Sequence, residues 1–127
     1  MKSILFFILS ACFWNVFPTD APFNSVETAF ANGDAQKIVA YSKDKILMSV
    51  LGKEGAYSTS QATLILKDFF NKKPVSSFKF IIKGKDTDEG SYAIGDYVSK
   101  NETFRIGVNF KKYGESFKID NISIEKN

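Results

Sequence analysis

Residues 57–74 read Tyr-Ser-Thr-Ser-Gln-Ala-Thr-Leu-Ile-Leu-Lys-Asp-Phe-Phe-Asn-Lys-Lys-Pro and predict the clearest helix of the chain. Ser58 and Gln61 have the spacing of a capping box, in which each side chain satisfies the free backbone N–H of the other residue. Lys72 and Lys73 complement the negative end of the helix, and Pro74 prevents its continuation. Start and stop signals are therefore both present.

One face of this helix is strongly apolar. Its members recur at helical spacing and are Ala62, Ile65, Leu66, Phe69 and Phe70, whereas Leu64 falls on the opposite side. A face that ends in two phenylalanines needs a broad apolar partner. The best candidate is a sheet built from the residues that follow.

After residue 77 the hydrophobic period changes to two, which is typical of strands. Strands are predicted around residues 78–83, 92–98, 104–111 and 117–124, with turns at 86–90, 100–101 and 113–114. Four successive strands joined by short turns predict an antiparallel meander. In the last strand Phe117 and Ile119 differ in phase from Ile122 and Ile124, which predicts a bulge near residues 120–121.

Two short helices are expected before this region. Asn24 is predicted to cap a helix over residues 24–32, and Gly33 ends it; Asp34 is predicted to cap a second helix that runs to about Ser42. Residues 46–51 form a short apolar run that predicts one strand, and residues 52–55 are expected to be a loop. The predicted fold is therefore α+β: two N-terminal helices, one strand, one helix, and a curved four-strand meander wrapped around Phe69 and Phe70.

Composition limits the chemistry. The 127 residues carry a net charge of +3, and the 17 basic residues are spread along the chain, so we expect no nucleic-acid partner. There is no histidine, and the one cysteine is Cys12. Ser-His-Asp and Cys-His catalysis are thus excluded, and we expect neither a metal site nor a cofactor.

The N-terminus predicts export. Lys2 precedes an apolar run that continues to Phe17, which is typical of a secretory signal peptide and too short for a spanning helix. We assign residues 1–21 to the signal and residues 22–127 to a single domain, in the periplasm or outside the cell. The alternative is a lipoprotein anchored to the membrane at Cys12, because Leu-Ser-Ala-Cys at residues 9–12 resembles a lipobox.

The order of elements, with Phe-Ala-Asn-Gly-Asp-Ala at residues 30–35, resembles the nuclear-transport-factor-two-like (cystatin-like) superfamily. More narrowly, the chain resembles the exported bacterial domain of unknown function 4783 over about residues 24–126. The motifs that carry this likeness are Tyr57-Ser58, Leu66-Lys67-Asp68-Phe69-Phe70, Tyr92-Ala93-Ile94-Gly95, Thr103-Phe104-Arg105 and Ile122-Ser123-Ile124-Glu125-Lys126. The resemblance implies a cone with an open end, export, and no established activity.

Asp96 is the weak candidate for catalysis. It shares a phase with Tyr92, Ile94 and Val98, so it is expected to point into the cone, with Ala93, Gly95 and Tyr97 on the other face. A carboxylate in an apolar pocket has a raised pKa and serves as an acid or a base. Ketosteroid-isomerase-like members of the superfamily use an interior Asp with oxyanion donors, although no residue here matches that constellation position by position. The alternative is a solvated Asp at a strand end.

Two further groups are candidates for binding. Tyr41, Tyr57 and Tyr92 are expected at the mouth of a ligand pocket, or else they pack in the core with the hydroxyl toward water. Tyr97, Arg105 and Asn109 share a sheet face with Gly95 and Gly107, where they form a homodimer interface, or where the glycines permit curvature.

Three functions follow from these observations. The first is a non-catalytic binding module of the cell envelope for a small apolar ligand or a protein partner. The second is an enzyme of the isomerase or dehydratase type with an interior carboxylate. The third is a mainly structural dimer.

Overall fold

The computed structural model describes residues 20–127, in which helix α4 (Thr59–Lys72) is the longest helix. The Ser58 hydroxyl accepts from the Gln61 backbone N–H, and the Gln61 side chain accepts from the Ser58 N–H, so the predicted capping box is confirmed. The apolar face is confirmed as well, since Leu66 and Phe69 are buried and Leu64 is 65% exposed.

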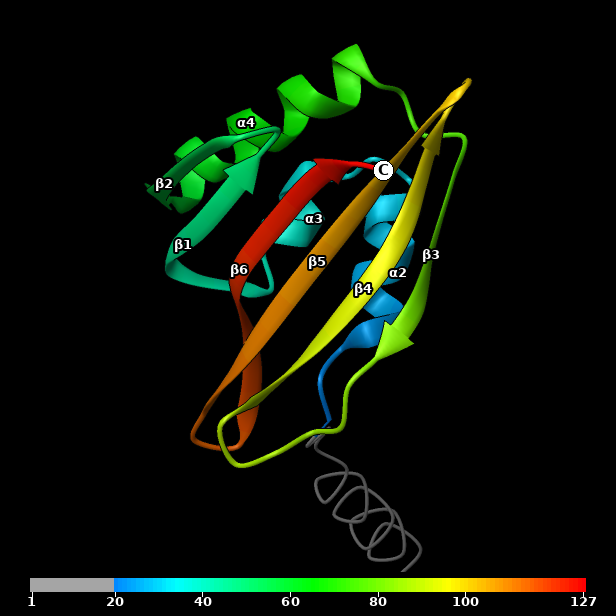
Figure 1. Ribbon diagram of the computed structural model, residues 1–127. Helices are drawn as coiled ribbons and strands as arrows, with labels where there is room; N and C mark the ends of the chain where they lie inside the picture. Colours follow the sequence, from blue (N-terminus) through cyan, green and yellow to red (C-terminus); the bar gives the residue numbers. More distant parts are fainter. Residues whose placement is uncertain (1–19) are drawn as a thin grey trace, which may run out of the picture.

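Six strands form one mixed, curved sheet (Figure 1). The strands are β1 (Ser42–Val50), β2 (Lys53–Ser58), β3 (Ser77–Lys83), β4 (Gly90–Ser99), β5 (Glu102–Tyr113) and β6 (Ser116–Lys126), in the order β2-β1-β6-β5-β4-β3. The meander from β3 to β6 is antiparallel, as predicted, whereas β1 pairs with β6 in parallel. Figure 1 shows α2 and α3 behind the sheet and α4 along the β1–β2 hairpin.

The hairpin corrects the prediction of one strand followed by a loop. Residues 53–58 pair with Lys45–Val50 as strand β2, although they contain few strand-forming residues. Pairing with the apolar β1 supplies their backbone hydrogen bonds. The Tyr57 ring lies close to Gly55, where a Cβ atom would be 2.7 Å from the end of the ring and would require the ring to shift. The sheet therefore has six strands.

The first helices differ from prediction in detail. Helix α2 (Phe23–Ala31) begins after Pro22 without a side-chain cap, so the predicted cap at Asn24 is wrong. Asp34 does cap α3 (Ala35–Val39), and its carboxylate accepts from the Lys37 N–H. Helix α3 ends at Val39, before the predicted end at Ser42, because β1 begins at Ser42.

The predicted phase of β4 is wrong. Ala93, Gly95 and Tyr97 face the helices and are buried, whereas Tyr92 and Asp96 lie on the outer face. Glycine is required at position 95 because a Cβ atom there would lie 2.6 Å from the Phe78 ring. Bulk alone indicated the wrong face, since the inner positions of β4 hold small side chains such as Ala93 and Gly95 beside the large Tyr97.

Aromatic rings fill the space between the sheet and the helices. Phe69 packs edge to face on Phe104 at a centroid distance of 5.3 Å, and Phe30 lies 5.0 Å from Phe78. All four rings belong to one buried cluster. The helix face that ends in Phe69 and Phe70 therefore closes the core of the domain.

The bulge predicted in the last strand is present. Asn109 of β5 pairs with Asn121, but the next residue, Phe110, pairs with Ile119. Asp120 is thus the extra residue, and it lets the apolar side chains on both sides of it reach the core.

Candidate functional site

A half-open groove of about 390 Å³ lies between α4 and the β1–β2 hairpin. Its lining is mostly apolar with charged residues among it, and consists of Val50, Leu51, Lys53, Tyr57, Leu64, Ile65, Asp68, Phe69, Lys72 and Lys73. This volume is within the range of small-molecule sites.

The geometry of the hairpin explains why the groove exists. Val50 and Lys53 are cross-strand partners, so their side chains share the face that α4 covers. Farther along β2 the Tyr57 ring lies over Gly55, where a Cβ atom would lie 2.7 Å from the end of the ring. Helix α4 follows β2 and runs back along the hairpin toward its tip (Figure 1). The two elements thus form the two walls.

The tip of the hairpin has an unfavourable backbone. Leu51 and Gly52 form the turn with φ of +51° and +90°, the left-handed region that suits glycine. For leucine this conformation costs about 1–2 kcal/mol. The Leu51 side chain is 48% exposed and lines the groove, so burial in the core does not offset this cost. Backbone strain of this kind is common at functional sites.

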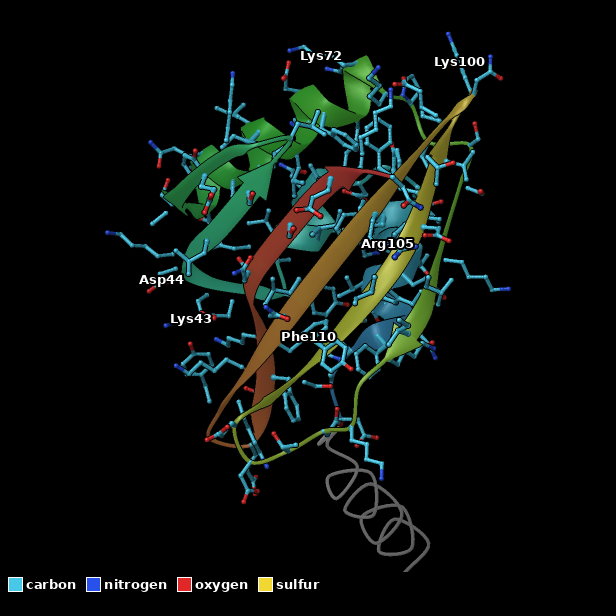
Figure 2. The ribbon with its side chains drawn as sticks, viewed as in Figure 1. Lys43, Asp44, Lys72, Lys100, Arg105 and Phe110 are labelled. Carbon is cyan, nitrogen blue, oxygen red and sulfur yellow. The ribbon has the colours of Figure 1, made fainter. Side chains whose placement is uncertain are left out.

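Most charges at the groove are paired. Lys72, at the end of α4 (Figure 2), lies 3.1 Å from Asp68, and Lys73 binds Glu102. Glu102 also contacts Lys126 at 2.8 Å; hydrogen bonds from Lys126 and from Lys73 lower the pKa of Glu102 to about 2. Within residues 20–127, Lys53 forms no ion pair.

The three tyrosines predicted at a pocket mouth do not meet. Only Tyr57 lines the groove. Tyr41 lies in a shallow polar depression beside α2 and α3. Tyr92 lies on the outer face of the sheet, with its ring over Gly84, where a Cβ atom would lie 2.3 Å away. The prediction that they share one site is therefore wrong.

The candidates on the sheet are separated as well. Arg105 projects from the face that has no helices (Figure 2) and lies 3.4 Å from Asp96 directly across β4 and β5. Asn109 is exposed on the same strand, but Tyr97 is fully buried and donates to the Lys73 carbonyl. The expected positions of Asp96 inside and Tyr97 outside are both wrong; a dimer through Arg105 and Asn109 stays a prediction.

Three further features concern only the described residues, 20–127. No aspartate or glutamate among residues 20–127 is buried, and these residues contain no cluster of three or more groups suited to hold a metal ion. Over the same range, no helix has the length and hydropathy needed to cross a membrane. Cys12 and most of the predicted signal peptide lie outside the described residues.

The architecture places the chain in the nuclear-transport-factor-two-like (cystatin-like) class of α+β folds. A nuclear-transport-factor-two-like protein of unknown function from Shewanella baltica superposes with a TM-score of 0.62 at 8% identity, over 82% of this chain and 86% of that chain. A ketosteroid isomerase-like protein from Erwinia carotovora atroseptica gives 0.63 at 11% identity, over 80% and 88%. At these identities the likeness shows the fold alone.

The family model gives a narrower assignment than the fold class. The model of the domain of unknown function DUF4783 matches residues 23–125, and the chain belongs to this family. A family protein from Bacteroides ovatus is 33% identical, with a TM-score of 0.76 over 81% of this chain and 93% of that chain. One from Bacteroides uniformis is 29% identical, with a TM-score of 0.78 over 85% and 98%. No curated protein matches the chain.

Sequence reasoning missed most of the groove. Two signals were available: Leu64 interrupts the polar side of an amphipathic helix, and Leu51 precedes Gly52 in a tight turn. Each is a large apolar side chain where a polar one is usual. Lys53 gave no such signal, because its place depends on pairing between β1 and β2; Tyr57 was predicted at a pocket mouth.

Proposed function

We propose that this domain is a non-catalytic binding module whose groove between α4 and the β1–β2 hairpin takes a small apolar ligand. One observation carries the proposal: the walls hold two large, exposed leucines, Leu51 and Leu64, above a buried floor that includes Phe69. A ligand that covers them gains about 25 cal/mol for each Å² of apolar surface removed from water.

The contacts around the groove suit a preformed site. Gln61 and Ser58 cap the start of α4, and Lys73 fixes its end through Glu102. The hairpin wall is held by pairing of β1 with both β2 and β6. A rigid wall on each side lowers the cost of ordering the site when a ligand binds.

The alternative, an isomerase or dehydratase with an interior carboxylate, has less support. It needs an acid and a hydrogen-bond donor in one apolar pocket. Asp96 faces outward beside Arg105, and Phe69 and Phe104 occupy the interior. The likeness to a ketosteroid isomerase-like protein does not add to it, because it concerns the fold.

Binding of decanol tests the proposal. Decanol titrated into the labelled domain should shift backbone amide NMR signals of α4 and the hairpin. Leu64→Asp should abolish these shifts because it places a charge on the apolar wall. Ile81→Asp is the matched control, since Ile81 is 51% exposed on the edge strand β3, outside the groove. Shifts that stay in Leu64→Asp, or that vanish equally in Ile81→Asp, would overturn the assignment.

We further propose that the protein is exported, on the basis of Lys2 and the apolar run to Phe17. The mass of the purified protein from the native host tests this directly. Loss of the first residues to a point near Ala21 supports a soluble exported form. A diacylated peptide that begins at Cys12 identifies the membrane-anchored form instead, and the intact N-terminus contradicts export.

A further inference from the structure

The groove lining carries a net positive charge. Its lining contains three lysines, Lys53, Lys72 and Lys73, against one acid, Asp68. Lys72 is paired with Asp68 on α4, and Lys73 shares Glu102 with Lys126. Lys53 is left as the groove lysine without a carboxylate partner among residues 20–127, so its charge is available to a ligand.

The hairpin fixes where this charge lies. Lys53 is the first residue of β2, and its cross-strand partner is Val50, the last residue of β1. Their side chains therefore share the groove face, next to the turn made by Leu51 and Gly52. The ammonium group thus stands at the tip of the hairpin, and the apolar wall begins beside it.

On the opposite wall, formed by α4, the basic residues likewise lie near the hairpin tip and the apolar residues lie away from it. Along α4, Leu64 and Ile65 come first, Asp68 and Phe69 one turn later, and Lys72 and Lys73 at the end. The groove is therefore apolar toward the middle of α4 and basic where the end of α4 meets the hairpin tip. A ligand that matches this order has an apolar body and one charged end.

We infer that the groove binds a single-chain amphiphile with an anionic head, with the head at Lys53 and the chain between Leu51 and Leu64. This inference rests on the proposed function, because it specifies the ligand of the same groove. It adds the sign of the charge on the head group, the orientation of the ligand's apolar chain in the groove, and the residue, Lys53, that selects the head group.

One effect opposes an anion here. The last carbonyls of α4 carry partial negative charge, which favours cations near this end. One of these carbonyls, that of Phe69, accepts a hydrogen bond from the Lys73 N–H, and Lys72 and Lys73 stand at that end, although they are paired with Asp68 and Glu102. Lys53 comes from the hairpin and has no carboxylate partner among residues 20–127. Its charge is therefore the one that favours an anionic head at the tip.

Three probes with one chain length separate the chain from the head: decanoate, decanol and decyltrimethylammonium, each below its micelle concentration and at neutral pH. The amide NMR titration gives Kd for each probe. Decanoate should bind about threefold to tenfold more tightly than decanol, as expected for one contact with a partly exposed charge, and the cation should bind most weakly.

Variants then locate the head. Lys53→Gln should remove the preference for decanoate over decanol. Lys79→Gln is the control, because Lys79 is an exposed lysine of β3 outside the groove. It should leave both affinities unchanged.

The outcomes are distinct for the two proposals. If decanol binds in the groove and decanoate binds no better, the anionic head is refuted and the apolar site stands. If Lys53→Gln has no effect and Lys72→Gln removes the preference, the assignment to Lys53 is overturned. If none of the probes shifts α4 or the hairpin, the proposed function itself fails.

Discussion

The ring of Phe69 on α4 lies against the ring of Tyr97 on β4, with their centroids 5.2 Å apart. Both side chains are buried, and the Tyr97 hydroxyl donates a hydrogen bond to the backbone carbonyl of Lys73, just past the end of the same helix. Tyr97 thus contacts α4 at two levels, by its ring and by its hydroxyl. The groove wall formed by α4 depends on this attachment to the sheet.

Replacement of Phe69 with Ala should lower the free energy of unfolding by about 3–5 kcal/mol, because it removes a buried ring and leaves a cavity among Tyr97 and Phe104. Urea denaturation followed by circular dichroism measures the change. Leu64→Ala, on the exposed side of the same helix, should change stability by less than about 0.5 kcal/mol. A loss below about 1 kcal/mol for Phe69→Ala would contradict its place in the core.

Tyr97 should also make stability fall at high pH. Burial raises the pKa of Tyr97 to about 12, whereas a tyrosine in the unfolded chain titrates near 10. Between these values the unfolded chain has released the Tyr97 proton and the folded chain has kept it. The contribution of Tyr97 to the free energy of unfolding is therefore full below a pH of about 10 and is lost as the pH rises toward about 12. Urea denaturation at a series of pH values measures this fall.

The matched variants for this test are Tyr97→Phe and Tyr92→Phe. Tyr97→Phe should remove this part of the fall, and at neutral pH it should cost about 1–3 kcal/mol because the Lys73 carbonyl loses its donor. Tyr92→Phe should leave the pH profile unchanged, since Tyr92 is 44% exposed. An unchanged profile in Tyr97→Phe would show that the hydroxyl is already solvated.

The elements that rest on local signals were predictable from the sequence. The capping box at Ser58 and Gln61, the Asp34 cap and the bulge at Asp120 each have a pattern that a few neighbouring residues define. Helix α4, the meander and the likeness to the family follow from the same kind of evidence. These features need no knowledge of which residues meet across the chain.

The features that were missed depend on contacts between distant residues. Strand β2 forms because β1 offers it a partner, and its own residues do not favour a strand. Gly95 lies on the inner face of β4 because the Phe78 ring comes close, so the bulk of the residues along β4 does not indicate which face is buried. The groove needs both the β1–β2 hairpin and the path of α4 over it. Tyr57 was the one predicted pocket residue that this arrangement brings to the groove.

Glu102 should make the fold sensitive to acid. Hydrogen bonds from Lys126 and Lys73 lower the pKa of Glu102 to about 2, from the ordinary value of 4.5 for a glutamate. Because this pKa is lowered in the folded chain, the contribution of Glu102 to the free energy of unfolding is full above a pH of about 4.5 and is lost as the pH falls toward about 2. Glu102→Gln should therefore flatten the loss of stability over this window, measured by urea denaturation at each pH. Glu115→Gln, at an exposed turn residue, should leave the slope unchanged.

Asp96 should be dispensable for the fold. Its ion pair with Arg105 is solvent-exposed on the outer face of the sheet, and such pairs contribute at most about 1 kcal/mol. Asp96→Asn should thus keep the midpoint of thermal unfolding within a few degrees and leave decanol binding intact. A large loss of stability, or a loss of binding, would mean that the carboxylate has a partner beyond Arg105.

The contact between Ala21 and Asp86 predicts a limit on truncation. The Ala21 side chain is buried, and its backbone N–H donates to the Asp86 carboxylate at 3.2 Å, which ties the start of the chain to the segment between β3 and β4. A chain that begins at Ala21 keeps this contact and turns it into an ion pair between its new ammonium group and Asp86. A chain that begins at Pro22 loses both the contact and the burial, at a cost of about 1–2 kcal/mol. Thermal unfolding of the two chains, each with and without Asp86→Asn, measures the difference. The substitution should destabilise only the chain that retains Ala21. Equal effects in both chains would show that Asp86 acts through another group.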